Sequence, residues 1–326
     1  MLIAGATGTG KSVCLNCILG SFLCRTQPSD LKLLLIDPKR VEMSVYADEP
    51  HLIHPVVNEP SEAKNALEWA TKEMDQRFKA MARLGVRNIA GFNKRLASFG
   101  ENRPDELADL EHLPYIAIVI DELADLMMMA DRKDVENSIV RLAQLARACG
   151  IHMILATQRP SVNVVTGIIK ANFPCRVSFQ VASSADSRTI LDSVGAEKLL
   201  GKGDMLYRPG DTTLQRLHGA FLSDEDVCAL VGYWKNLAEP AYKVDFTQME
   251  ENGEKGKKNA GDDFEDELFE EVLAFVTDEG NASISKIQRR FKIGFNRSAR
   301  LVEALEARGY LEPSDGSKPR KLKLPH

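Results

Sequence analysis

The sequence predicts an α/β protein with a mostly parallel sheet covered by helices, followed by a small second domain. Short apolar runs alternate with helical patterns from Met1 to about Ala238, which is typical of such a sheet. A glycine-rich octet follows the first apolar run, and helical periodicity resumes at Phe264 behind a polar stretch. We therefore expect a first domain over residues 1–240, an acidic flexible linker over 241–263 and a second domain over 264–326.

The octet GATGTGKS has the G-x-x-x-x-G-K-[ST] spacing of a phosphate-binding loop, between an apolar strand and a helical pattern. Backbone N–H groups approach phosphate only where no Cβ intervenes, and the helix N-terminus adds a favourable dipole. Lys11 would reach the β and γ phosphates of ATP, and the Ser12 hydroxyl would ligate Mg²⁺. A simple glycine-rich turn is the alternative. The expected nucleotide contacts are Gly5, Ala6, Thr7, Gly8, Thr9, Gly10, Lys11 and Ser12, together with Asp121 from a later strand.

Four more strands and one long helix are expected in the first domain. The strands span residues 31–37, 115–121, 152–157 and 175–180, and an amphipathic helix with Ser61 as its N-cap spans 61–84. The apolar run ending in Asp121 and Glu122 is typical of a Walker B strand, because ligands gather at the carboxyl edge of a parallel sheet. Asp121 would hold Mg²⁺ and Glu122 would polarise the attacking water. A purely structural acidic pair is the alternative.

Two further polar positions are candidates for the hydrolysis of a nucleotide. Gln158 stands at the tip of the strand after Walker B, where a side chain can sense the γ phosphate. The helical stretch RLAQLARACG, expected to end at Cys149, carries Arg141 and Arg147. An arginine finger must face a neighbouring subunit, and a helix end suits that role. The alternatives are a loop-capping glutamine and ordinary salt-bridging arginines.

Charge and cysteine usage limit the class of protein further. The chain has 42 Lys and Arg and 47 Asp and Glu, but these charges are unevenly distributed. Residues 241–280 carry about nine more acidic than basic residues, and residues 281–326 carry about seven more basic than acidic ones. A basic end suggests a nucleic-acid reader, and a solvated charged face is the alternative. Only Cys14 and Cys17 of the six cysteines are close in sequence, so we expect buried thiols in a reduced cytosol rather than a zinc site. No run is long enough to span a bilayer and no signal peptide is visible, so this chain is expected to be cytoplasmic, without membrane contact.

The pattern of the basic C-terminal end predicts a winged helix. Apolar periodicity predicts three short helices, the second capped by Ser283 and the third opening at Asn296, followed by two paired strands around a hairpin tip. The third helix would enter the major groove of DNA, and the wing would contact phosphates. A helical hairpin used for protein contacts is the alternative. The expected base readers are Asn296, Arg297, Arg300 and Glu303, and the expected wing contacts include Lys318 and Arg320.

Several long stretches resemble the motor domain of the FtsK/SpoIIIE DNA translocases. They include GATGTGKS, IDPKRVEMSVY, GVRNIAGFN, YIAIVIDELADLM, RLAQLARACGIHMILATQRPSVNVVTGIIKANFP, SRTILDSVGAEKLLGKGDMLY and HGAF. The resemblance implies a RecA-like fold and a homo-hexameric ring that pumps double-stranded DNA. It implies that Arg147 is the finger acting in trans and that Arg159, Lys170 and Arg188 grip the DNA backbone from pore loops. Ser184 departs from the lysine that many members carry, which bears on the strength of that grip.

The stretch IGFNRSARLVEALEARGYL is similar to the recognition helix of the family's C-terminal γ domain. In the family, that module recognises short G-rich polar sequences that orient the motor, and it activates the Xer recombinases. The resemblance implies that this chain segregates chromosomes at cell division, anchored at the septal inner membrane wherever the family's membrane segments are present. Because the chain begins at the strand before the octet, we expect an N-terminally truncated motor with weakened ring assembly.

Two other classes of protein stay open on the sequence. A secretion or conjugation ATPase would share the motor but would have no use for a basic winged helix. A DNA-binding regulator would use the phosphate loop only as a nucleotide switch, and its ATP turnover would respond little to duplex DNA.

Overall fold

The computed structural model describes residues 1–246 except 101, 211 and 243, and then 268–282, 284–291, 298, 301–302, 305–306, 310–311 and 320–322. The chain divides into two compact units, Met1–Gly253 and Glu254–His326, and each is described by itself. Among the described residues, no helix combines the length and the apolar character that a bilayer crossing needs.

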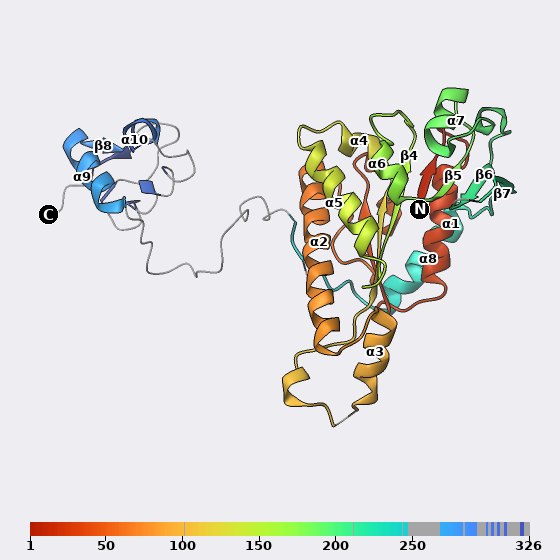
Figure 1. Ribbon diagram of the computed structural model, residues 1–326, viewed down its shortest axis with the longest axis horizontal. Coiled ribbons are helices and arrows are strands. Elements are labelled where there is room, and N and C mark those ends of the chain that lie inside the picture. The colour runs from red at the N-terminus through yellow and green to blue at the C-terminus, as the bar shows by residue number, and fades with distance from the viewer. Residues whose placement is uncertain are drawn as a thin grey trace. The chain divides into compact units, whose positions relative to one another are not determined.

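The first unit is built on a seven-stranded sheet in the order β2-β3-β4-β1-β5-β6-β7 (Figure 1). The five strands from β2 to β5 in this order pair in parallel, and β6 and β7 add an antiparallel edge. The predicted mostly parallel sheet is therefore confirmed. The strands are β1 (Leu2–Ala4), β2 (Leu31–Ile36), β3 (Tyr115–Ile120), β4 (Ile151–Thr157), β5 (Cys175–Ser178), β6 (Asp204–Pro209) and β7 (Gln215–His218).

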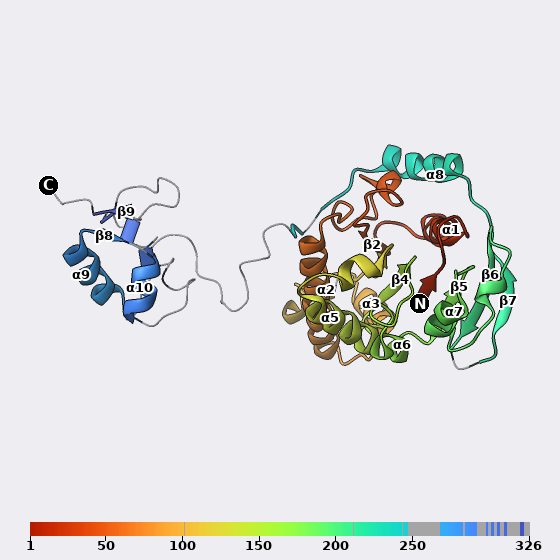
Figure 2. The same cartoon turned by 90° about the horizontal axis from the view of Figure 1, so that it is seen from above.

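Helices cover both faces of this sheet, as Figure 2 shows from above. On one face, α1 and α8 pack over a core that includes Ile3, Leu19 and Val231. On the other, α2, α4, α5, α6 and α7 enclose a larger core that includes Leu67 and Ile139. Strands buried on both faces read as unbroken apolar runs, which is why the central strands could be located from sequence. The helices are α1 (Lys11–Leu23), α2 (Pro60–Arg83), α3 (Ile89–Ser98), α4 (Leu123–Met127), α5 (Arg132–Leu145), α6 (Gly167–Asn172), α7 (Ser184–Leu191) and α8 (Asp224–Leu237), with short 3₁₀ turns at Ser44–Tyr46, Asp105–Leu107 and Ala196–Lys198.

Two helix ends differ from the sequence prediction. Helix α2 begins at Pro60 with Glu59 at the N-cap, because proline fits the first turn, where its missing N–H has no intrahelical acceptor. Helix α5 ends at Leu145 and not at Cys149. The chain must turn there to enter β4, and Gly150 allows this with a φ of 80°. Arg147 consequently lies in the turn after α5.

Cys14 and Cys17 are half-buried on α1 rather than fully buried. Burial, with a smaller contribution from neighbouring Cys17, raises the pKa of the Cys14 thiol to about 11. Both cysteines are uncharged thiols at neutral pH.

The first residues of the expected linker belong to the first unit. Phe246 is fully buried, with its ring centroid 4.5 Å from that of His54 and 5.8 Å from that of Trp69. The Asn65 side chain donates a hydrogen bond of 2.9 Å to the Phe246 carbonyl. The packed part of the first unit therefore reaches at least residue 246, and residues 247–263 lie outside the described ones.

The second unit has a small core of its own. Helices α9 (Phe269–Glu279) and α10 (Ile284–Phe291) accompany a short antiparallel pair, β8 (Asn281–Ala282) with β9 (Arg320–Lys321). Leu311 forms an antiparallel bridge with Leu322, which agrees with the expected pairing of the wing strands, whereas β8 was not anticipated. The buried residues are Phe269, Val272, Val276, Ala282, Ile287, Leu301, Val302, Leu305 and Leu311.

Candidate nucleotide-binding site

The octet forms a loop that is hydrogen-bonded to the ends of the two strands flanking β1. The Gly5 N–H donates to the Thr157 carbonyl at the end of β4, at 3.3 Å, and the Ala6 N–H donates to the Gln180 carbonyl just past β5, at 2.9 Å. The Thr9 carbonyl accepts the N–H of Gly203 at 3.0 Å. Helix α1 begins immediately afterwards at Lys11, so the loop's exit is a helix N-terminus, which favours anions.

Two glycines are required by this geometry. A Cβ on Gly10 would lie 2.8 Å from the Gly203 nitrogen, and Gly10 has a φ of 117°. A Cβ on Gly5 would lie 2.7 Å from the Phe179 Cβ. The cradle exists because these positions carry no side chain.

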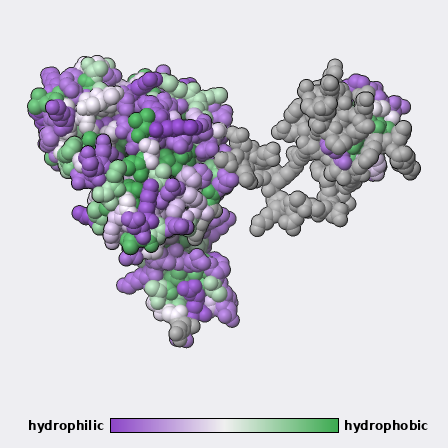
Figure 3. All heavy atoms as spheres, turned by 180° about the vertical axis from the view of Figure 1, so that it is seen from behind, coloured by the Kyte–Doolittle hydropathy of each residue, from purple (hydrophilic) through white to green (hydrophobic). Residues whose placement is uncertain are grey.

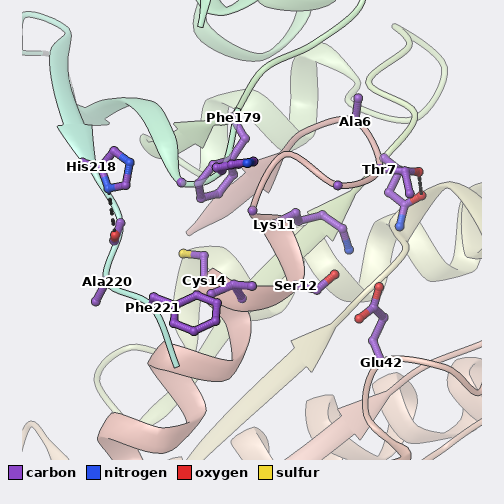
Figure 4. A pocket seen from close by; sticks show the side chains of 17 residues that line it. Ala6, Thr7, Lys11, Ser12, Cys14, Glu42, Phe179, His218, Ala220 and Phe221 are labelled. Atoms are coloured by element: carbon purple, nitrogen blue, oxygen red, sulfur yellow. Dashed lines mark hydrogen bonds between the residues drawn. The ribbon is translucent and has the colours of Figure 1, made fainter. Parts of the chain in front are cut away.

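The loop borders a cavity of about 360 Å³ (Figure 4). Its lining combines the octet with residues from far along the chain, and Phe221 on the rim is 79% exposed. Sequence reasoning missed most of these distant residues, although HGAF was part of the family resemblance. The lining residues are Ala6, Thr7, Gly8, Gly10, Lys11, Ser12, Val13, Cys14, Glu42, Gln158, Phe179, Lys202, Gly203, His218, Gly219, Ala220 and Phe221.

Lys11 and Asp121 form a buried pair beneath the loop. The Lys11 ammonium donates to one Asp121 carboxylate oxygen and, at 2.9 Å, to the Asp121 backbone carbonyl. The other oxygen, Oδ2, is buried and has no hydrogen-bond partner among the described residues. Burial raises the pKa of Asp121, and the charge of Lys11 opposes this shift. An unpaired buried acceptor is costly, so this oxygen fits a bound cation or its water.

Glu122 lies beside Asp121 and is held by three donors. Its Oε1 accepts the Thr157 hydroxyl at 2.6 Å, its Oε2 accepts the Lys39 ammonium at 3.0 Å, and the Gln158 N–H lies 3.2 and 3.1 Å from the two oxygens. Burial alone would raise the pKa of Glu122, but these hydrogen bonds outweigh it and lower the pKa. Glu122 is therefore an ionised carboxylate. Lys39 was not singled out by sequence reasoning.

Gln158 connects β4 to the phosphate loop. Its side-chain oxygen accepts the Thr7 hydroxyl at 3.0 Å, and the side chain lines the cavity. Asp37, directly after β2, accepts backbone N–H groups of residues 39, 42 and 43 and shapes that turn.

The two candidate finger arginines differ in their surroundings. Arg141 pairs with Asp75 at 2.8 Å on the surface. Arg147 is exposed. The pKa of His152 is lowered mainly by the burial of His152 and, to a smaller extent, by the positive charge of Arg147. Neither side chain lines the cavity of its own chain.

Of the expected DNA contacts of the first unit, Arg159 follows β4, Lys170 lies on α6 and Arg188 lies on α7. Arg159 and Arg188 are exposed. Lys170 on α6 pairs with Asp192 at 2.7 Å, and Arg176 pairs with the same carboxylate. In the second unit, Asn296, Arg297, Arg300, Glu303 and Lys318 lie outside the described residues, and of Arg320 only the backbone in β9 is described.

The fold and the site together define a P-loop nucleotide-binding protein with a RecA-like sheet. The conjugation coupling protein TcpA of pCW3, solved with ATPγS, is similar at 28% identity and a TM-score of 0.60, covering 72% of this chain and 64% of that one. The cytoplasmic domain of the type VII secretion ATPase EccC of Thermomonospora curvata, at 22% identity and a TM-score of 0.60, covers 74% and 28% and shares the fold.

Sequence comparison gives the family. The FtsK/SpoIIIE family model matches residues 1–162 and the Ftsk gamma domain model matches residues 263–324. DNA translocase FtsK of Oceanobacillus iheyensis is 49% identical over 326 residues, covering 100% of this chain and 40% of the relative. The same-named protein of Clostridium acetobutylicum is 51% identical over 324 residues, covering 99% and 41%. The chain belongs to the FtsK/SpoIIIE family and spans about two fifths of the length of these relatives.

Replacing Gly10 by Ala tests the cradle. The new Cβ meets a backbone nitrogen at 2.8 Å, so the turn at Gly203 must move. We expect Gly10→Ala to weaken binding of a fluorescent ATP analogue at least about tenfold, near the loss of one charged hydrogen bond. Gly85→Ala is the control, because Gly85 also has a positive φ but no heavy atom near its Cβ position. Unchanged affinity in Gly10→Ala would contradict this geometry.

Proposed function

We propose that this chain is the motor and DNA-reading part of an ATP-driven double-stranded DNA translocase. The observation that carries the proposal is the cavity bordered by the octet, which Lys11 lines while its ammonium forms a buried ion pair with Asp121. Family membership supports the choice of duplex DNA as the substrate that is moved.

Each residue of the site has a separate role in ATP hydrolysis. The loop amides and Lys11 hold the β and γ phosphates of ATP, and Gln158 contacts the γ phosphate or the lytic water. Glu122 takes a proton from that water while the water oxygen forms a bond to the γ phosphorus. The bond between the γ phosphorus and the β–γ bridging oxygen breaks in the same step. ADP and phosphate leave. Arg147 of a neighbouring subunit stabilises the charge that develops, which agrees with the finding that Arg147 does not line the cavity of its own chain.

Mg²⁺ fits the same site. Ser12 lines the cavity and the Oδ2 of Asp121 is a buried acceptor without a partner among the described residues, so these two side chains would hold the ion, directly or through water. The ion supplies charge neutralisation of the phosphates.

Arg159, Lys170 and Arg188 grip the DNA backbone in this proposal. Phosphate contacts carry no sequence information, which suits a motor that moves over any duplex. Lys170 must exchange Asp192 for a phosphate oxygen, while Arg159 and Arg188 are already exposed. A homo-hexameric ring would place these residues around a central pore.

The second unit would read the orientation of the DNA. The gamma-domain match and the small helical core with its antiparallel pair support a winged helix. Through it, the chain would recognise orienting sequences in chromosome segregation at cell division and would activate Xer recombinases. The same match disfavours a secretion or conjugation ATPase, although TcpA and EccC share the motor fold.

Duplex DNA should stimulate ATP hydrolysis by this chain. We expect turnover to rise several-fold on a long duplex, and Lys11→Ala to lose it because the phosphates lose their cation. Glu122→Gln should keep nucleotide affinity while turnover falls about 10²- to 10⁴-fold, the usual contribution of a general base. A duplex without effect on turnover, or an active Lys11→Ala variant, would sink the motor proposal.

Base reading by the second unit is tested with Arg297→Ala. We expect it to weaken binding to a preferred site by about 1–3 kcal/mol more than binding to random duplex, because a bidentate contact to guanine is lost. Competition titrations at one fixed salt concentration measure both losses. Equal losses on the two sequences would mean that Arg297 contacts only the backbone.

A further inference from the structure

Both oxygens of the Glu122 carboxylate already accept hydrogen bonds, and the side chain is fully buried. An ionised carboxylate offers about four lone-pair positions. Oε1 faces the Thr157 hydroxyl and the Gln158 N–H, and Oε2 faces the same N–H and the Lys39 ammonium. A general base must present an acceptor to the water that it deprotonates. In this arrangement, the departure of one donor would open an acceptor position of Glu122 to that water.

Of the three donors, Lys39 is the one able to leave. Thr157 is fully buried in β4, and the Gln158 N–H belongs to the backbone at the end of that strand. The Lys39 side chain is 33% exposed and lies on the turn after β2. Its ammonium is carried on a flexible four-carbon stem, so it moves without any change in the sheet.

A second acceptor lies within reach of Lys39. The Asp125 carboxylate, on α4, is 27% exposed and stands 3.9 Å from the Lys39 ammonium. The ammonium can therefore pass from Glu122 to Asp125 without becoming an unpaired charge, while Glu122 keeps its hydrogen bonds from Thr157 and Gln158.

The turn that bears Lys39 also borders the nucleotide cavity. The Asp37 carboxylate accepts the N–H groups of Lys39, Glu42 and Met43 at 3.2, 3.0 and 2.9 Å, which ties residues 37–43 together. The Glu42 side chain lines the cavity and points toward Ser12 (Figure 4). A phosphate or cation arriving near Ser12 acts on Glu42 electrostatically, and through this turn on Lys39.

We propose that Lys39 is a positioning residue that holds Glu122 in a resting arrangement, and that its transfer to Asp125 releases Glu122 for hydrolysis. The inference rests on the proposed function, because it concerns the same carboxylate. It adds a restraint on basal ATP turnover, built from a lysine outside the octet and the Walker B strand.

Lys39→Met tests the restraint in the full chain. We expect the turnover number without DNA to rise about tenfold, the effect of losing one charge-assisted hydrogen bond, while the KM for ATP stays within twofold. The ratio of DNA-stimulated to DNA-free turnover should fall accordingly. Asp125→Asn, which weakens the alternative acceptor, should lower the DNA-stimulated rate.

Lys64→Met is the matched control. Lys64 has a similar exposure of 25% and pairs with Asp131 at 2.9 Å, but it lies on α2 away from Glu122. Its loss should leave both rates unchanged. Lys39→Arg keeps the charge and should lie closer to wild type than to Lys39→Met, which a merely structural lysine would not require.

The outcomes separate this inference from the proposed function. If wild type is active and Glu122→Gln is not, but Lys39→Met shows a DNA-free rate that is unchanged or lower, the restraint is refuted and the motor proposal stands. If Glu122→Gln keeps the wild-type rate, the assignment of Glu122 as the base fails first. A rise in Lys39→Met that disappears in the Lys39→Met, Glu122→Gln double variant supports the restraint.

Discussion

The suspension of the phosphate loop between two strands is the constraint on which the rest of the structure depends. Hydrogen bonds from Gly5 and Ala6 attach the loop to the ends of β4 and β5, and the N–H of Gly203 closes it from the far side. These three contacts involve backbone atoms only, so they fix the loop whatever side chains surround it. The backbone of the anion site is therefore preorganised.

The buried pair below the loop is better explained by function than by stability. Lys11 is 3% exposed and Asp121 is fully buried, and removing two charges from water costs about as much as their attraction returns. Apolar side chains of similar volume could occupy this space without loss of stability. In the proposed function, the pair would supply a cation for phosphate and a carboxylate oxygen for a metal ion. On the face of the first unit seen in Figure 3, apolar patches alternate with hydrophilic side chains.

The sequence predicted the parts of the site that are local in the chain. The octet, the strand ending in Asp121 and Glu122, and the strand ending in Gln158 each carry their signal within about a dozen residues. The parallel strands were found because burial on both faces leaves an apolar run. The edge strands β6 and β7 were missed because most of their residues are partly or fully exposed and no such run marks them.

Contacts made across the chain could not be predicted in the same way. Phe179, His218 and Phe221 reach the cavity only because β5, β6 and β7 extend the sheet beside the loop. In the sequence, Lys39 is one of several charged residues in a polar turn, and only the folded structure shows its hydrogen bond to Glu122. Phe246 is a lone aromatic residue just before a polar stretch, and it packs against Trp69 of α2 and His54 of the segment before α2.

The central claim is that neighbouring subunits complete each other's nucleotide sites, and mixing two inactive variants tests it most directly. Lys11→Ala lacks a working loop but keeps Arg147, whereas Arg147→Ala keeps the loop and lacks the arginine. The account predicts that each variant alone loses DNA-stimulated ATPase activity and that their mixture regains part of it, while Arg141→Ala stays active. A mixture as inactive as its components, or an Arg147→Ala protein with the wild-type rate, would contradict it.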